Sequence, residues 1–232
     1  METTSVTEAR MPLPRVLEPE IMSSAEEAGE YDAMDFSATD QLFAERAAEL
    51  ARGARWIFDI GSGNAKIPLA MAALVTDPAR ICAIEMSAEM LAAGVRNRLH
   101  AGAVAHRLLF LRADAKRLPL PDACADLVTS NSLVHHIPDP RAVFREVARI
   151  VRPGGSILIR DLVRPESEEE LAHLAGKHAF GSSPLQRRLF SDSLRAALTL
   201  AEVRDSLGEC GLAGVSVTKI TDRHWSAERI LT

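Results

Sequence analysis

The sequence predicts a doubly wound α/β fold in which one mostly parallel sheet is covered by helices on both faces. From residue 55 onward, short apolar runs alternate with segments whose apolar residues recur at helical spacing. The strand-like runs are almost continuously apolar, as is typical of strands buried on both faces. A chain of 232 residues with 47% apolar and 25% charged residues is long enough for one substantial domain of this kind.

The chain is expected to begin with a flexible arm over residues 1–22, which are rich in Pro, Glu and Thr. Residues 23–232 are expected to form a single domain that starts with two helices, at 23–29 and at 36–53. In the second helix four apolar residues recur at helical spacing, and Gly53 is a stop signal. These apolar residues are Leu42, Phe43, Ala47 and Leu50.

The apolar runs after Gly53 predict five strands. They are expected at residues 55–60, 80–85, 108–112, 125–130 and 156–162. Helices are expected between them at 64–75, at 140–151 and directly after Ser87, which has the side chain of a helix N-cap. The motif RPGG at 152–155 predicts a turn that ends the last of these helices.

Residues 164–210 interrupt this rhythm and predict a helical insertion after the fifth strand. The segment contains an acidic helix start, a break at FGSSP and a last helix in which Thr199 and Glu202 have capping-box spacing. Residues 214–221 alternate like a strand, and the tail RHWSAERIL adds one more, which makes seven strands. Because insertions of this kind lie above the carboxyl ends of the strands, we expect 164–200, together with the arm around Tyr31, to form a mobile cover over the acceptor site.

Charge and cysteine content disfavour several classes of protein. A formal net charge of −5 is not typical of a nucleic-acid binder, whose binding surface is basic, so no nucleic acid is expected as a partner. The charged residues after the fifth strand, such as Arg160, Asp161 and Arg164, are interpreted mostly as a solvated surface. The three cysteines show no Cys-x-x-Cys spacing, which predicts reduced thiols.

The sequence shows neither a membrane-spanning run nor the pattern of a secretory signal. No apolar run approaches the roughly 18–20 residues of a membrane span, and the N-terminus lacks a basic start followed by an apolar core. We therefore expect a cytoplasmic protein. The sequence leaves the oligomeric state open.

Chemically useful residues stand at the ends of four predicted strands. The first strand ends in DIGSG, with Gly61 and Gly63; the second ends in Glu85, the third is followed by Asp114, and the fourth by Asn131. In an open parallel sheet, ligands bind at the carboxyl ends of the strands, near the point where the strand order reverses. Each residue alone has an ordinary explanation, such as a tight turn or a helix cap, but the joint pattern indicates a ligand site.

The glycine pattern narrows the class of ligand. A dinucleotide-binding loop has a third glycine where this chain has Lys66, and no Gly-Lys-Ser/Thr sequence of a phosphate loop follows. Glu85 stands roughly 20 residues beyond the glycines, the spacing at which an acidic side chain meets the hydroxyls of a ribose. The sequence therefore predicts an adenosine-containing ligand without a pyrophosphate. An NAD(P)-dependent oxidoreductase is the less favoured alternative.

Four segments, taken in chain order, resemble the class I S-adenosylmethionine-dependent methyltransferases: FDIGSGNAK, AIEMSAEML, LRADAKRLPLPDACADLVTSNSLVHHIPDP and REVARIVRPGGSILIRDL. The resemblance covers about residues 31–220 and is nearest to the group that acts on small molecules and quinones. It implies a Rossmann-like methyltransferase fold, S-adenosyl-L-methionine as cofactor and a small-molecule methyl acceptor. The family commonly has a third loop glycine where this chain has Ala65, so we expect a slightly altered turn there.

The resemblance also implies roles for the residues at the strand ends. Gly61 and Gly63 would let the backbone approach the methionine part of the cofactor, near Asp59 and Ser62. Glu85 would accept hydrogen bonds from both ribose hydroxyls. The remaining implied contacts are Tyr31 and Asn131 at the methionine end, and Met86, Asp114 and Ala115 around the adenine.

Methyl transfer from a sulfonium is an in-line displacement, so catalysis can come largely from orientation. A general base is needed only where the acceptor keeps a proton at neutral pH, and the candidates are His135 and His136 in SNSLVHHIPDP. Adjacent residues of a helix point about 100° apart, so we expect at most one of them to face the site. No further residue stands at ligand spacing, so no metal site is expected. An RNA or protein acceptor, or cofactor binding without catalysis, are the alternative functions.

Overall fold

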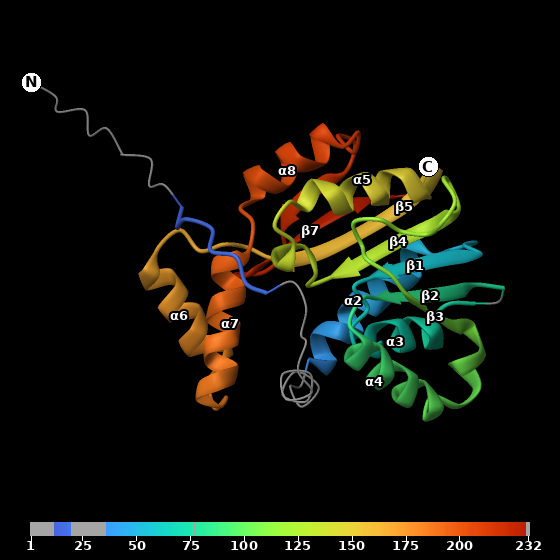
Figure 1. Cartoon of the computed structure of the whole chain (residues 1–232), viewed down its shortest axis with the longest axis horizontal. Coiled ribbons are helices and arrows are strands. Elements are labelled where there is room, and N and C mark those ends of the chain that lie inside the picture. The colour runs from blue at the N-terminus through green and yellow to red at the C-terminus, as the bar shows by residue number, and fades with distance from the viewer. Residues whose placement is uncertain (1–11, 20–35, 77, 231–232) are drawn as a thin grey trace, which may run out of the picture.

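The computed structural model describes residues 12–19, 36–76 and 78–230, which contain one seven-stranded sheet with helices on both faces (Figure 1). The helix expected at 23–29 and Tyr31 lie outside the described residues. The strands are β1 (Trp56–Ile60), β2 (Arg80–Glu85), β3 (Leu108–Arg112), β4 (Ala125–Asn131), β5 (Val151–Leu162), β6 (Ser216–Lys219) and β7 (His224–Arg229). Their order in the sheet is β3-β2-β1-β4-β5-β7-β6.

The sheet is parallel from β1 to β5, whereas β7 pairs antiparallel with β5 and β6 pairs antiparallel with β7. The predicted doubly wound, mostly parallel sheet of seven strands is therefore confirmed. Chain order runs outward from β1 through β2 to β3 on one side, and from β4 to β5 on the other. The carboxyl ends of β1 and β4 thus flank the switch point at which sheets of this type bind ligands.

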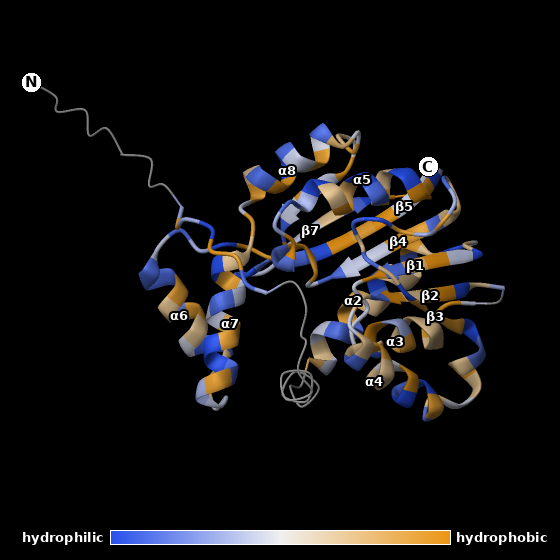
Figure 2. Cartoon of the chain, viewed as in Figure 1, coloured by the Kyte–Doolittle hydropathy of each residue, from blue (hydrophilic) through white to orange (hydrophobic). Residues whose placement is uncertain are grey.

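Five helices bury apolar residues on opposite faces of the sheet. They are α2 (Ser37–Leu50), α3 (Lys66–Leu74), α4 (Ala88–Leu99), α5 (Pro140–Ile150) and α8 (Leu200–Glu209). Phe43 of α2 and Met71 of α3 are buried with Ile57 in one cluster, and Phe144 of α5 belongs to the cluster on the other face, with α8. Leu42 is 61% exposed, because it lies on the solvent side of α2. Figure 2 shows the hydrophobic residues concentrated in the central strands.

Two helices, α6 (Glu168–His178) and α7 (Pro184–Ala196), stand apart from the sheet (Figure 1). Leu162 at the end of β5 packs with Leu171, Leu174 and Leu194 of these helices in a small cluster of their own. The last helix of the segment, α8, instead packs against the sheet, and its predicted capping box is present. Within the described ranges, no helix is long and apolar enough to cross a membrane.

Two local features differ from the sequence prediction. Helix α3 begins two residues later than expected, because Ala65 has a left-handed φ of 60° and ends the turn before it. The motif RPGG does not form a separate turn but lies in the irregular start of β5. There Val151 pairs with Ala125 and Ser156 pairs with Leu127, so the residues between Val151 and Ser156 are looped out of the ladder.

Candidate active site

The glycine loop between β1 and α3 follows a backbone path that favours glycine. Gly61, Gly63 and Ala65 have φ values of 72°, 54° and 60°, and the left-handed region costs a residue with a side chain about 1–2 kcal/mol. A Cβ atom on Gly61 would lie 2.8 Å from the Leu133 side chain, and the Gly61 amide donates to the carbonyl of Ile84 in β2. Both turn geometry and close approach therefore require glycine at position 61. Ala65 adopts the left-handed conformation that a glycine would take.

Glu85, at the end of β2, is fixed beside this loop by two backbone donors. Its Oε2 accepts a hydrogen bond from the Gly63 amide at 2.9 Å, and its Oε1 accepts one from the Ser87 amide at 2.8 Å. Ser87 in turn caps α4, as predicted, by accepting a hydrogen bond from the Met90 amide. Because each carboxylate oxygen has a second lone pair, Glu85 can accept two further hydrogen bonds in a fixed geometry. This is the geometry needed to bind a pair of adjacent hydroxyls.

The loop also holds buried polar groups without complete partners. Asp59 in β1 is 3% exposed and accepts a hydrogen bond from the Thr129 hydroxyl at 2.6 Å. Burial raises the pKa of this carboxyl to about 7, and the negative charge of Glu85 adds to the effect. Ser62 Oγ is buried and has no hydrogen-bond partner among the described residues. These two groups would be satisfied by a cationic, hydrogen-bonding ligand such as an amino acid.

The loop after β3 lies beside the end of β2. The Ala113 amide donates to the Glu85 carbonyl at 3.2 Å, so the loop that contains Asp114 and Ala115 begins beside the end of β2. Met86 is 37% exposed and Ala115 is buried. Asp114 accepts from the Lys116 amide at 2.9 Å and forms an ion pair with its ammonium at 3.1 Å.

Asn131 ends β4 on the other side of the switch point. Its Nδ2 donates to Ser132 Oγ at 3.3 Å, and Ser132 itself has a left-handed φ of 56°. The chain therefore turns sharply after Asn131 and enters the short 3₁₀ helix η2 (Val134–His136), which carries both candidate histidines. Of the expected cofactor residues, all but Tyr31 lie within the described chain, at the ends of β1 to β4 or in the loops that follow.

His135 is buried and held by Asp161 of β5. Its Nδ1 lies 2.5 Å from Asp161 Oδ1, while Asp161 Oδ2 accepts a hydrogen bond from the Val134 amide at 2.6 Å. Burial opposes a charge on both side chains, but the Asp161 carboxylate holds the pKa of His135 above its usual range. The pKa of Asp161 is correspondingly lowered. The ring of His135 is thereby fixed in one orientation.

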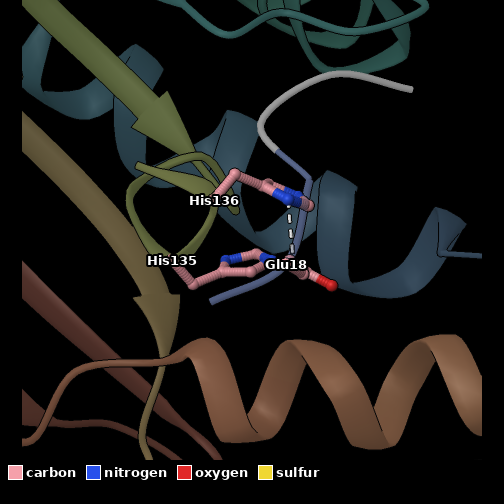
Figure 3. A group of neighbouring side chains, drawn as sticks. All are labelled: Glu18, His135 and His136. Carbon is pink, nitrogen blue, oxygen red and sulfur yellow. Dashed lines mark ion pairs between the residues drawn. The ribbon is translucent and has the colours of Figure 1, made fainter. Parts of the chain in front are cut away.

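Glu18 brings the two histidines together, as Figure 3 shows. Its Oε1 lies 3.3 Å from His135 Nε2 and 3.0 Å from His136 Nδ1, and the two ring centroids are 4.0 Å apart. Both rings thus contact one carboxylate, and the expectation that at most one histidine faces the acceptor stays a prediction. Adjacent Cα–Cβ bonds do diverge, but both rings turn toward a carboxylate that enters from another part of the chain.

Glu18 belongs to residues 12–19, which we call the strap. Arg15 attaches the strap by donating hydrogen bonds from its guanidinium to four backbone carbonyls, those of His135, Ile137, Pro138 and Ala196. The Val16 amide donates to the Arg195 carbonyl, and the Ser193 hydroxyl donates to Glu18. The strap therefore links η2 to α7. The expected flexibility of the 1–22 arm stays a prediction, but this part of it makes specific contacts.

The sequence interpretation missed Asp161 and Glu18. Asp161 was assigned with Arg164 to a solvated surface, yet they are 1% and 5% exposed, and Arg164 donates to Glu202 Oε1 at 2.6 Å. Applying the strand-end rule to the fifth strand as well would have found Asp161, which stands beside the end of β4. No local pattern marks Glu18, because its role depends on where the strap packs.

Comparisons with known proteins agree with this geometry. Residues 58–159 match a family model described as a methyltransferase domain. A ubiquinone/menaquinone biosynthesis C-methyltransferase of Azotobacter vinelandii is 27% identical over 181 residues, which cover 75% of this chain and 70% of that protein. The 27-O-demethylrifamycin SV methyltransferase of Amycolatopsis mediterranei is 32% identical over 178 residues, and the match spans 75% of this chain but only 61% of that relative.

Solved structures share the fold at low sequence identity. A putative S-adenosylmethionine-dependent methyltransferase of Methanococcus maripaludis superposes with a TM-score of 0.69 at 20% identity, covering 94% of this chain and 97% of that one. A methyltransferase of Aquifex aeolicus gives a TM-score of 0.63 at 16% identity, covering 90% and 99%.

Proposed function

Because the chain belongs to the class I S-adenosylmethionine-dependent methyltransferases, we propose that it transfers the cofactor's methyl group to a small molecule bound beside η2. The observation that carries the proposal is the fixed Glu85 carboxylate at the switch point. It is supported by the buried Asp59 and by the Ser62 hydroxyl, which has no hydrogen-bond partner in the described part of the chain. Relatives that act on quinones and on a rifamycin support a small-molecule acceptor.

The residues at the strand ends fit the cofactor in their chemistry. Glu85 would accept from the ribose hydroxyls, while Asp59 and Ser62 would hold the ammonium and carboxylate of the methionine part. Met86 and Ala115 would pack on the adenine, and Asp114 would accept from its amino group. The cofactor supplies a methyl group that is already activated on sulfonium. The protein's task is therefore to hold the acceptor in line with it.

The acceptor side is proposed to lie between η2 and the helices α6 and α7. Asn131 and the sharp turn at Ser132 lead directly from the cofactor site to His135 and His136. For an acceptor that keeps its proton at neutral pH, the cluster of these histidines with Glu18 and Asp161 is the proposed place of deprotonation. The strap closes one side of this region through the contacts of Arg15.

The net charge and the cysteines bear on the class of acceptor and on the compartment. The net charge of −5 gives no electrostatic support for RNA binding. The three cysteines are free, as suits a reducing compartment, and we propose that the protein acts in the cytoplasm.

We expect Glu85→Ala to weaken S-adenosylmethionine binding by roughly 10- to 100-fold, because hydrogen-bonding groups of the bound ligand would lose their partners at a cost of about 1–3 kcal/mol. Isothermal titration with S-adenosylmethionine, S-adenosylhomocysteine and NAD measures this directly. Glu45→Ala, an exposed carboxylate on α2, is the control and should bind like the wild type. Tighter binding of NAD than of S-adenosylhomocysteine would contradict the proposed cofactor.

The acceptor can be sought by incubating the protein with methyl-labelled S-adenosylmethionine and a cell metabolite extract, followed by mass spectrometry. We expect a labelled small molecule whose yield falls strongly with Glu85→Ala when the cofactor is below saturation. Label found only in RNA or protein would transfer the function to the macromolecular class. Binding without any transfer would support a cofactor-binding protein that is not a catalyst.

A further inference from the structure

The cluster of Glu18, His135 and His136 has the composition of a metal site. One ligand atom from each residue, a carboxylate oxygen or a ring nitrogen, lies within 4.8 Å of the other two. The three side chains converge on one point from η2 and the strap (Figure 3). We propose that these residues bind a first-row transition-metal dication, for which Zn²⁺ is the natural probe.

The distances between the ligand atoms suit a dication. Glu18 Oε1 lies 3.0 Å from His136 Nδ1 and 3.3 Å from His135 Nε2. Zinc binds imidazole nitrogen and carboxylate oxygen at about 2.0–2.2 Å, so two neighbouring ligands of a tetrahedral site lie roughly 3.3–3.5 Å apart. Small side-chain rotations would bring the three atoms to these separations. Imidazole with carboxylate is a ligand set that suits zinc, iron and other metals of this row.

The state of His136 points to a missing partner. Its Nδ1 is buried and forms an ion-pair contact with Glu18 Oε1 at 3.0 Å, but the angles of this contact do not make a hydrogen bond within the described part of the chain. A buried ring nitrogen without a well-aligned hydrogen bond carries a cost in stability. A metal ion accepts the lone pairs of both atoms at once and removes this cost.

Asp161 supplies the support that metal-binding histidines usually have. It accepts from His135 Nδ1 at 2.5 Å, which leaves Nε2, the nitrogen facing Glu18, as the metal-binding atom. A carboxylate behind the imidazole fixes the tautomer and the direction of the ring. Asp161 in turn accepts a hydrogen bond from the Val134 amide, which fixes its carboxylate against η2.

The proposed site gives the strap a role, because the strap carries Glu18, the third ligand. Glu18 reaches the histidines from the strap, which Arg15 fastens across η2 and α7. Three protein ligands leave a fourth position for water or for an oxygen of another molecule. This position would lie at the acceptor side, next to the end of β4. An acceptor hydroxyl bound there would lose its proton to solvent more readily, because a bound dication lowers the pKa of a coordinated oxygen.

The test is Zn²⁺ titration of the metal-free full chain by calorimetry, with Co²⁺ absorption as a second readout. Neither measurement needs cofactor or acceptor, so the outcome is independent of the proposed methyl transfer. We expect one ion per chain. Glu18→Gln and His136→Asn should each weaken binding at least tenfold, and Asp161→Asn by about 10- to 100-fold.

His178→Asn is the matched control, since His178 also lies beside a carboxylate, with its Nε2 2.8 Å from Asp222. Its affinity for Zn²⁺ should equal that of the wild type. Circular dichroism confirms that each variant is folded. Absence of stoichiometric binding, or binding that persists unchanged in both Glu18→Gln and His136→Asn, would overturn the proposal and leave an ion-pair cluster.

Discussion

Replacing Asp59 by Asn is expected to weaken S-adenosylmethionine binding at pH 8 by roughly 10- to 100-fold while making the free protein more stable. The carboxyl is 3% exposed, accepts one hydrogen bond from Thr129, and has no cationic partner among the described residues. Asn keeps an oxygen that can accept from Thr129 but cannot pair with the cofactor's ammonium. A hydrogen bond to a charged group contributes about 1.5–3 kcal/mol, which gives the expected range.

The effect of Asp59 on stability follows from the direction of its pKa shift. Burial raises the pKa of Asp59 from 3.8 to about 7 in the folded protein. Between pH 3.8 and pH 7, Asp59 is therefore protonated in the folded state but ionised in the unfolded state. The free energy of unfolding falls as the pH rises through this range. Above pH 7 the loss is complete and amounts to at most about 4 kcal/mol. Asp59→Asn should be more stable than the wild type at pH 8, and the difference should shrink toward pH 5.

Two measurements separate these effects. Urea unfolding at pH 5 and pH 8 reports the stability of each variant without cofactor. Calorimetry in buffers of different ionisation enthalpy reports whether binding near pH 7 releases a proton that Asp59→Asn does not release. The control is Asp205→Asn, because Asp205 is exposed and its replacement should leave both the stability and the cofactor affinity unchanged. Asp126→Asn is unsuitable, because the Asp126 carboxylate accepts hydrogen bonds from two backbone amides. Equal cofactor affinity of wild type and Asp59→Asn at pH 8 would contradict the assigned role.

The central fold could be predicted because local and global signals agree in it. Ile57, Ile81 and Leu127 lie in continuous apolar runs and are fully buried in neighbouring strands. The alternation of strands and helices predicts parallel pairing, which β1 to β5 show, and the family resemblance is confirmed by the matched methyltransferase domain. The start of β5 could not be predicted, because the looped-out path from Val151 to Ser156 depends on pairing with β4 rather than on RPGG itself.

The cofactor-binding loop could be predicted from the sequence more fully than the histidine cluster. Glu85 and the glycines are neighbours of strand ends, so their meeting follows from the topology, and Glu85 does contact the Gly63 amide. The histidine cluster depends on packing between distant segments. His135 and His136 were identified, but Glu18 has no pattern around it and the burial of Asp161 depends on η2 folding over β5.

Replacing Arg15 by Met is expected to lower the free energy of unfolding by about 3 kcal/mol. The guanidinium donates at 2.7–3.1 Å to the carbonyls of His135, Ile137, Pro138 and Ala196, which come from two separate parts of the chain. A methionine keeps most of the side-chain volume but none of the donors. Each hydrogen bond to a charged group contributes about 1.5–3 kcal/mol, and water can replace part of this total at the half-exposed carbonyls. For a domain of this size the corresponding drop in Tm is roughly 6–12 °C.

The loss of Arg15 should also act at a distance, through Glu18. Without its anchor the strap would leave η2, so hydrogen exchange at residues 134–138 should rise and Zn²⁺ binding should fall together. Arg188→Met is the matched control, because Arg188 is 78% exposed and its only ion pair among the described residues is a 3.5 Å contact with Asp192. Arg15→Lys keeps the charge but cannot span four carbonyls, so it should resemble Arg15→Met. If instead Arg15→Met unfolds like Arg188→Met, the strap does not hold η2 in place, and the histidines must owe their positions to Asp161 alone.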